Sequence, residues 1–144
     1  MTWDRRNLTV AEAAAMSGIH RASIDLLIHR AKDVETLFSE KRGSRRWFSP
    51  RDVCVLRIAF ELERSGRNWL TAIGTAFDHL FEGPPEPDAL LIAPAVQKRA
   101  CGLPRIISDR DVPRLSFERS EIIIPIGLIV HSIMEAADGL AIQS

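Results

Sequence analysis

Four basic residues surround a single glycine in segment 40–49, which reads EKRGSRRWFS. Guanidinium and ammonium groups carry a full positive charge at neutral pH and donate hydrogen bonds without accepting any. When such groups lie close together on one loop, they are suited to bind phosphate oxygens, for example those of a nucleic-acid backbone. We therefore expect Lys41, Arg42, Arg45 and Arg46 to contact phosphate groups. The alternative is a basic turn that is only solvated.

The charges of the chain are divided unequally between its two halves. The whole chain of 144 residues contains 19 Lys plus Arg and 19 Asp plus Glu, so its formal net charge is zero. Residues 1–72 contain 13 basic and 9 acidic residues, a net charge of +4, whereas residues 73–144 contain 6 and 10, a net charge of −4. This asymmetry indicates a first half that binds a polyanion and a second half with another role.

A helix-turn-helix pattern precedes the basic segment. Thr9 and Glu12 have the spacing of a capping box, which predicts a helix that begins there and stops at Gly18. After a turn of about three residues, a second helix is expected over 20–31, because its apolar residues recur at helical spacing. These apolar residues are Ile24, Leu27, Ile28 and Ala31. Two short helices joined by a sharp turn are typical of a DNA-binding helix-turn-helix.

The next segments predict a hairpin and two further helices. Residues 36–39 and 46–48 are rich in β-branched and aromatic side chains, so two short strands are expected there with a loop at 40–45 between them. Ser49 and Pro50 predict the start of a third helix, which runs to about Ser65 and ends at Gly66. A fourth helix is expected over 68–80. A hairpin that follows a helix-turn-helix is called a wing.

Three stretches of this half carry a resemblance to a known family. The stretches LTVAEAAAMSGI, SRRWFSPRDVCVLRIAFEL and ERSGRNWLTAI resemble the winged helix-turn-helix domain of the mercury-resistance-regulator (MerR) family over roughly residues 7–80. The resemblance implies that helix 20–31 enters the major groove of double-stranded DNA and that Arg46 lies along the phosphate backbone. The chain departs from the family in segment 25–28, which reads DLLI where the family has an arginine, two tyrosines and a glutamate. The family's base contacts are therefore not transferred to this segment.

The predicted DNA-contacting residues come from the two helices and the wing, here defined as residues 40–47. The polar residues of helix 20–31 that lie outside its apolar stripe are candidates for base or phosphate contacts, although its arginines are equally compatible with ordinary surface charges. The full predicted set is Thr9, Arg21, Ser23, His29, Arg30, Lys41, Arg42, Ser44, Arg45 and Arg46.

The second half predicts a smaller lobe behind a proline-rich boundary. We divide the chain into a DNA-binding domain at 1–82, a linker at 83–88 and a dimerisation or partner-binding lobe at 89–144. Segments 89–92, 104–107 and 121–124 have strand character, and a helix is expected from Pro125 until Gly139. We expect the apolar face of this helix to form a dimer interface through Ile126, Ile129, Val130, Ile133, Met134 and Ala137. The alternative is that the lobe packs on its own N-terminal domain.

Together these features predict a mainly α fold with small β elements, in which an N-terminal winged helix-turn-helix precedes a small α/β C-terminal lobe. We expect no enzyme, cofactor or metal site, because the four histidines lie in separate helices without a catalytic motif and Cys54 and Cys101 lie far apart as reduced thiols. We also expect a cytoplasmic, nucleoid-associated bacterial protein, because neither a signal sequence nor a long apolar stretch is present.

The function predicted from the sequence is a dimeric, sequence-specific regulator of transcription, most simply a repressor. Three other DNA-binding classes share such a head: an excisionase-like architectural factor, a small subunit of phage packaging, and an antitoxin whose C-terminal lobe binds a partner protein.

Overall fold

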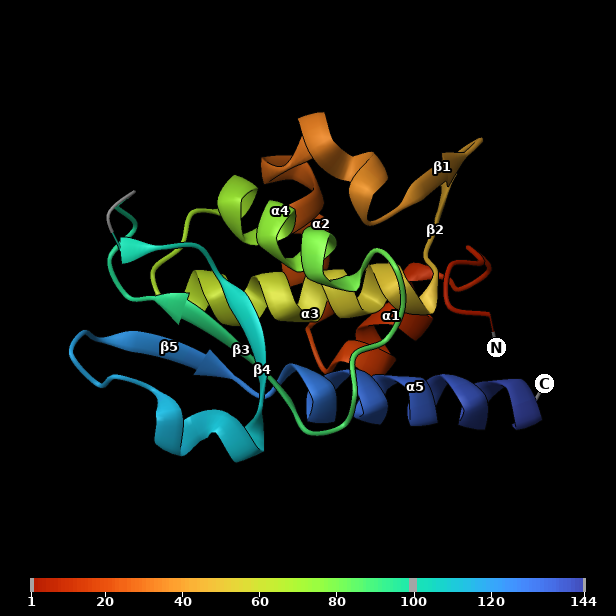
Figure 1. The fold of residues 1–144 in the computed structure, drawn as a ribbon. Helices are drawn as coiled ribbons and strands as arrows, with labels where there is room; N and C mark the ends of the chain where they lie inside the picture. The colour runs from red at the N-terminus through yellow and green to blue at the C-terminus, as the bar shows by residue number, and fades with distance from the viewer. Residues whose placement is uncertain (1, 99–100, 144) are drawn as a thin grey trace.

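The computed structural model describes residues 2–98 and 101–143 as a mainly helical fold with two small antiparallel sheets, in agreement with the predicted fold class (Figure 1). The N-terminal elements are α1 (Val10–Ser17), α2 (Arg21–Arg30), the 3₁₀ helix η1 (Lys32–Leu37), β1 (Glu40–Arg42), β2 (Arg45–Trp47), α3 (Pro50–Arg64) and α4 (Trp69–Leu80). The C-terminal elements are β3 (Ala89–Pro94), β4 (Arg105–Ser108), the 3₁₀ helix η3 (Asp109–Arg114), β5 (Glu121–Ile124) and α5 (Ile126–Gln143). No helix among the described residues is long and apolar enough to cross a membrane.

Local signals set the bounds of α1 as predicted, and α2 follows after the expected turn. The Thr9 hydroxyl accepts a hydrogen bond from the Glu12 amide at 3.1 Å, and the Glu12 carboxylate accepts one from the Thr9 amide at 2.9 Å. Gly18 ends α1 with a φ of +71°, a left-handed conformation that glycine adopts without strain. Helix α2 then buries Ile24 and Leu27 against the core. The predicted pair of helices and its turn are therefore confirmed.

Helix α3 passes through the middle of the molecule, with α4 on one side and α5 on the other (Figure 1). Ser49 and Asp52 form a second capping box at its start. Because α1, α4 and α5 all pack against it, seven of its apolar side chains have no exposed surface: Val53, Cys54, Val55, Leu56, Ile58, Ala59 and Leu62. Burial, and to a lesser extent the negative charge of Asp52, raises the pKa of the Cys54 thiol. Cys54 is thus a protonated packing residue.

The three-stranded sheet has the order β4-β3-β5, with both neighbours antiparallel to the central strand β3. Leu91 and Ala93 of β3 belong to the same core as the N-terminal helices. The buried Arg67, between α3 and α4, donates a hydrogen bond to the carbonyl oxygen of Pro94 at the end of β3. Burial lowers the pKa of the Arg67 guanidinium. The sheet is therefore packed onto the N-terminal half by both apolar and polar contacts.

The apolar face of α5 lies against the protein's own helices α1 and α3. The expectation of a dimer interface is wrong for four of its residues, because they are at most 3% exposed within a single chain: Ile126, Val130, Ile133 and Ala137. Ile129 and Met134 are half-buried and pack against the same core. The C-terminal half thus follows the alternative prediction, in which it packs on its own N-terminal domain.

The proline-rich segment 83–88 lies against the start of α5. A Cβ atom added to Gly127 would lie 2.1 Å from the carbonyl oxygen of Glu86, so only glycine allows the two backbones to approach this closely. The imidazole Nε2 of His131 also lies 3.2 Å from the carbonyl oxygen of Pro85. The predicted end of α5 at Gly139 is wrong, since the helix continues to Gln143 and Leu140 still packs against the core.

Candidate nucleic-acid interface

The basic segment forms a hairpin, but its first strand lies later in the chain than predicted. The prediction of a strand at 36–39 is wrong, because η1 takes part of this segment and Phe38 is fully buried in the core. The strands are instead β1, in which every residue is charged, and β2, which ends in Trp47; residues 43–44 join them. Gly43 has a φ of +62°, which suits the first position of such a tight turn. The packing of Phe38 thus decides where the hairpin begins.

Strand pairing distributes the four cations over both faces of the hairpin. Lys41 lies opposite Arg46, and Arg42 lies opposite Arg45. Because side chains alternate along a strand while cross-strand partners share a face, each of these pairs occupies one face. The hairpin therefore presents basic residues in two directions.

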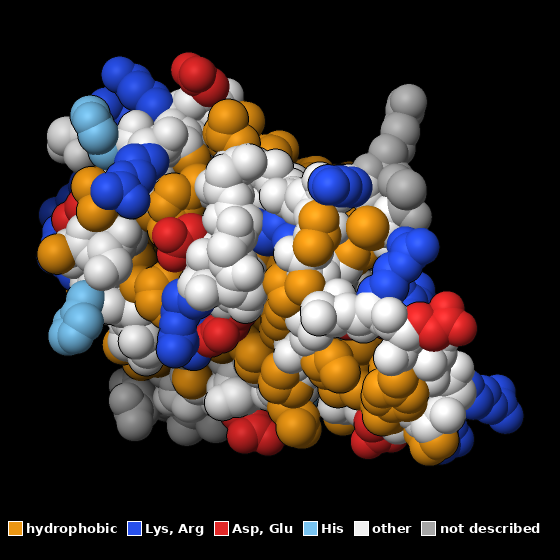
Figure 2. All heavy atoms as spheres, turned by 90° about the vertical axis from the view of Figure 1, so that its left-hand side faces the viewer, with side chains coloured by type: hydrophobic (Ala, Val, Ile, Leu, Met, Phe, Trp, Pro, Cys, Tyr) orange, Lys and Arg blue, Asp and Glu red, His pale blue; other side chains and the backbone are white. Residues whose placement is uncertain are grey.

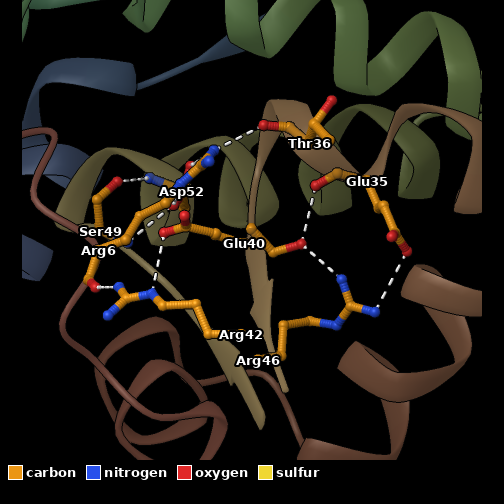
Figure 3. Close-up of polar contacts among 9 residues, drawn as sticks. Arg6, Glu35, Thr36, Glu40, Arg42, Arg46, Ser49 and Asp52 are labelled. Carbon is orange, nitrogen blue, oxygen red and sulfur yellow. Dashed lines mark hydrogen bonds and ion pairs between the residues drawn. The ribbon is translucent and has the colours of Figure 1, made fainter. Parts of the chain in front are cut away.

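Arg46 is held by the element that precedes the hairpin (Figure 3). Its guanidinium forms an ion pair with the Glu35 carboxylate at 3.2 Å and donates a hydrogen bond to the Ser39 hydroxyl at 3.0 Å. Only 20% of the Arg46 side chain is exposed. The residue that the family resemblance assigns to phosphate thus attaches β2 to η1 in this structure.

Arg42 is also paired within the protein (Figure 3). Its Nε atom lies 3.1 Å from a carboxylate oxygen of Glu40, and its Nη2 atom donates a hydrogen bond to the backbone carbonyl of Arg6. The guanidinium carbon lies 5.2 Å from the centroid of the Trp47 ring, a cation–π distance. Arg42 therefore links both strands of the hairpin to the N-terminal segment.

A partly buried ion pair between Arg6 and Asp52 lies next to this link. Arg6 contacts the Asp52 carboxylate through Nε at 2.8 Å and through Nη2 at 3.2 Å, and it donates a further hydrogen bond to the Thr36 carbonyl oxygen at 2.6 Å. The Asp52 side chain has no exposed surface and also accepts from the Ser49 amide at 2.8 Å. The N-terminal segment, η1 and the start of α3 are thereby joined beneath the hairpin. No local sequence signal indicates this role of Arg6.

Lys41 and Arg45 differ from their neighbours. Both are exposed, and within the described part of the chain neither side chain forms an ion pair or a hydrogen bond. An unpaired cation retains its full hydration in the free protein and can exchange that hydration for a phosphate oxygen. Of the four cations of the hairpin, these two have no partner within the described residues, whereas Arg42, although 51% exposed, is paired with Glu40.

Five of the predicted residues meet at one groove of about 520 Å³ between α1, α2 and the hairpin. Thr9 comes from the start of α1, Arg21 from the first turn of α2, and Ser44, Arg45 and Arg46 from the hairpin. The Thr9 hydroxyl already caps α1, so the fold alone explains this residue. The groove brings the exposed Arg21 and Arg45 to the same concave surface.

The other predicted residues of α2 lie outside the groove lining. Ser23, His29 and Arg30 are exposed on the helix. His29 and Arg30 occupy the last turn, where positive charge is favourable beside the carbonyl end of the helix dipole. Their positions are therefore compatible with a ligand contact but do not require one. The acidic Asp25, absent from the predicted set, does line the groove.

The opposite end of the molecule has a different surface. Five of the nine exposed large hydrophobic side chains among the described residues lie between positions 96 and 123: Val96, Leu103, Ile106, Phe117 and Ile123. Figure 2 views this end, where hydrophobic and acidic side chains interrupt the basic ones. Such a mixed surface is less suited to follow a phosphate backbone than the groove beside the hairpin.

Neither a search for metal-binding clusters among the described residues nor comparisons with known proteins add a second candidate site. Within residues 2–98 and 101–143, no group of three or more His, Cys, Asp or Glu side chains could hold a metal ion. In comparisons with known proteins, no family model matches the chain, and no curated protein is significantly similar to it.

Proposed function

We propose that the protein binds double-stranded DNA in a sequence-specific manner and regulates transcription, most simply as a repressor. In this proposal α2 enters the major groove and the hairpin lies against the phosphate backbone. The observation that carries the proposal is the groove in which Arg21 and Arg45 converge, because neither arginine forms an ion pair within the described residues, although Asp25 shares the lining. This function would place the protein on the bacterial nucleoid.

The shape of α2 supports this orientation. Its 10 residues span about 15 Å, and its outward side is exposed from Arg21 to Arg30. The major groove of B-DNA is about 12 Å wide and admits an α-helix of this kind. The resemblance to the MerR family, which rests on the sequence alone, implies the same orientation.

The contacts differ from those that the resemblance implies. Arg42 and Arg46 keep the hairpin in place, so we assign the phosphate contacts of the hairpin to Lys41 and Arg45. Each phosphate that a cation neutralises releases condensed counterions, and the logarithm of the affinity then falls with log salt by about 0.9 per contact. The assignment of these two cations therefore predicts how steeply the affinity for DNA falls as the salt concentration rises.

The test is a salt titration of binding to a labelled random-sequence DNA duplex. Replacing Lys41 and Arg45 together with Ala is expected to flatten the salt slope by about 1 to 2 units and to weaken binding to all sequences alike. The control variant Lys98→Ala, Arg114→Ala removes the same charge at the other end of the molecule. Its salt slope is expected to equal that of the wild type. An unchanged slope in a folded Lys41→Ala, Arg45→Ala protein would leave the basic hairpin as a solvated turn.

A second candidate is a DNA-binding protein that also holds a protein partner, such as an antitoxin or a packaging subunit. The exposed hydrophobic side chains between positions 96 and 123 favour it, because such side chains are frequent in protein interfaces. A second copy of the chain is also compatible with this surface, although the buried face of α5 is not. Light scattering of the purified protein with and without DNA distinguishes a homodimer from a monomer that needs another protein.

A further inference from the structure

Asp25 is the only acidic residue of α2 and, among the described residues, the only acidic one that lines the groove beside the hairpin. It shares this lining with Arg21, one helical turn earlier, and with Arg45 of β2. Within the described residues, its exposed carboxylate forms neither an ion pair nor a hydrogen bond, although Arg21 is four positions away. The groove lining therefore contains an unpaired carboxylate together with two cations that are also unpaired within the described residues.

A carboxylate at this position has a cost in a surface that faces DNA. It repels phosphate, and when ionised it accepts hydrogen bonds but donates none. Unless a donor lies opposite, Asp25 weakens binding to every sequence by loss of hydration and by repulsion. In the major groove the donors of the bases are the amino groups of cytosine and adenine.

Cytosine fits a carboxylate better than adenine does. The adenine amino group has the N7 acceptor beside it on the same base, which repels the second carboxylate oxygen. Cytosine presents its N4 amino group without an adjacent acceptor on the same base, and acidic side chains accept from it. The recognition is thus a discrimination between bases rather than a general gain of affinity.

We propose that Asp25 is a specificity-determining residue that selects DNA sites with a cytosine amino group beneath the first half of α2. This inference rests on the proposed function, because it requires α2 to lie in the major groove. Arg21 and Arg45 supply attraction to any duplex, and Asp25 makes that attraction conditional on the base.

The experiment is a selection from duplexes with a randomised segment, followed by competition between the selected site and its single-base-pair variants. The wild-type protein is expected to enrich cytosine at one position and to discriminate against other bases there by about 5- to 150-fold, the range of one good base contact. Asp25→Asn is expected to abolish the preference at that position alone and to raise the affinity for random DNA.

A matched variant controls for net charge. Asp33→Asn removes an exposed carboxylate from η1, outside the groove, and is expected to keep the cytosine preference. Thermal melts check that both variants are folded, which is expected because both side chains are exposed. Wild-type protein that selects no duplex at all would overturn the proposed function together with this inference. Selection of one motif by wild-type and Asp25→Asn protein, with equal preference at every position, would overturn the role of Asp25 alone.

Discussion

The basic hairpin and helix α5 are both segments in which the sequence indicates contact with a partner, and the structure treats them differently. The apolar face of α5 is covered by α1 and α3 of the same chain, whereas the hairpin leaves Lys41 and Arg45 exposed and unpaired within the described residues. The hydrophobic effect is not directional, so an apolar face can be buried against any apolar surface, and the same chain supplies the nearest one. An exposed cation remains available to a ligand. Substitutions in α5 should therefore change folding, and substitutions in the hairpin should change binding.

The largest effect is expected for Ile133→Asp in α5. Ile133 is 3% exposed, so the change removes a core side chain and places a charge in an apolar environment. We expect the free energy of unfolding to fall by at least about 3 kcal/mol, measured by urea denaturation followed by circular dichroism. Leu128→Asp is the matched control, because Leu128 is on the same helix and 65% exposed, and its effect should stay within about 0.5 kcal/mol.

The opposite outcome would break the comparison between α5 and the hairpin. If Ile133→Asp remained as stable as the wild type and only lowered the mass measured by light scattering, the helix would face a second copy rather than its own core. The Leu128→Asp control adds information of its own, since a change of mass in that variant would place an interface on the exposed side of α5.

A smaller effect on stability is expected where segment 83–88 meets α5. In Gly127→Ala the added methyl group meets the backbone of Glu86 and Pro87, and backbone yields less readily than a flexible side chain. We expect a loss of about 1 to 3 kcal/mol, the usual cost of overpacking. Gly139→Ala is the control in the same helix, with no atom within 4 Å of the added Cβ, and it should stabilise the protein by up to about 1 kcal/mol. Equal stability of both variants would mean that the two backbones separate freely.

The features that could be predicted from the sequence are those that depend on residues close together in the chain. The capping pairs at Thr9 and Ser49 and the left-handed Gly18 act within a few residues, so the bounds of α1 and the start of α3 follow from them. The start of β1 does not follow from such local signals, because it depends on the burial of Phe38 in the core. The packing of α1 and α3 against α5 and the ion pair between Arg6 and Asp52 both involve residues far apart in the chain. No rule about sequence spacing predicts such contacts.

The residue types of the candidate site could be predicted from the sequence, but the contacts that these residues make in the folded protein could not. Four cations beside a glycine indicate phosphate, and the same residue types are found at the groove. Which of these cations form ion pairs or hydrogen bonds within the protein depends on the acceptors that the fold brings close to them. Glu35 lies 11 positions before Arg46 in a different element, and the carbonyl of Arg6 lies 36 positions before Arg42. The division of the hairpin into structural and exposed cations thus required the tertiary structure.

The smallest effect distinguishes the two classes of cation within the hairpin itself. Arg46→Ala removes the ion pair with Glu35, and because these side chains are 20% and 26% exposed, solvent screening limits the loss of stability to about 1 kcal/mol. Arg45→Ala removes no contact within the described residues and should change stability by less than about 0.5 kcal/mol. The salt slope of DNA binding should respond in the opposite order, with the larger change in Arg45→Ala.

A double-mutant cycle with Glu35→Gln isolates the pair from other effects of truncation. The coupling energy between Arg46 and Glu35, measured by urea denaturation, should be about 0.5 to 1 kcal/mol and should shrink at high salt, because a partly exposed ion pair is screened. The same cycle in DNA binding gives the critical comparison. If Glu35→Gln strengthened DNA binding and Arg46→Ala abolished that gain, Arg46 would leave Glu35 for phosphate in the complex. In that case the pair with Glu35 would compete with DNA, and Arg46 would join Lys41 and Arg45 as a ligand of the backbone.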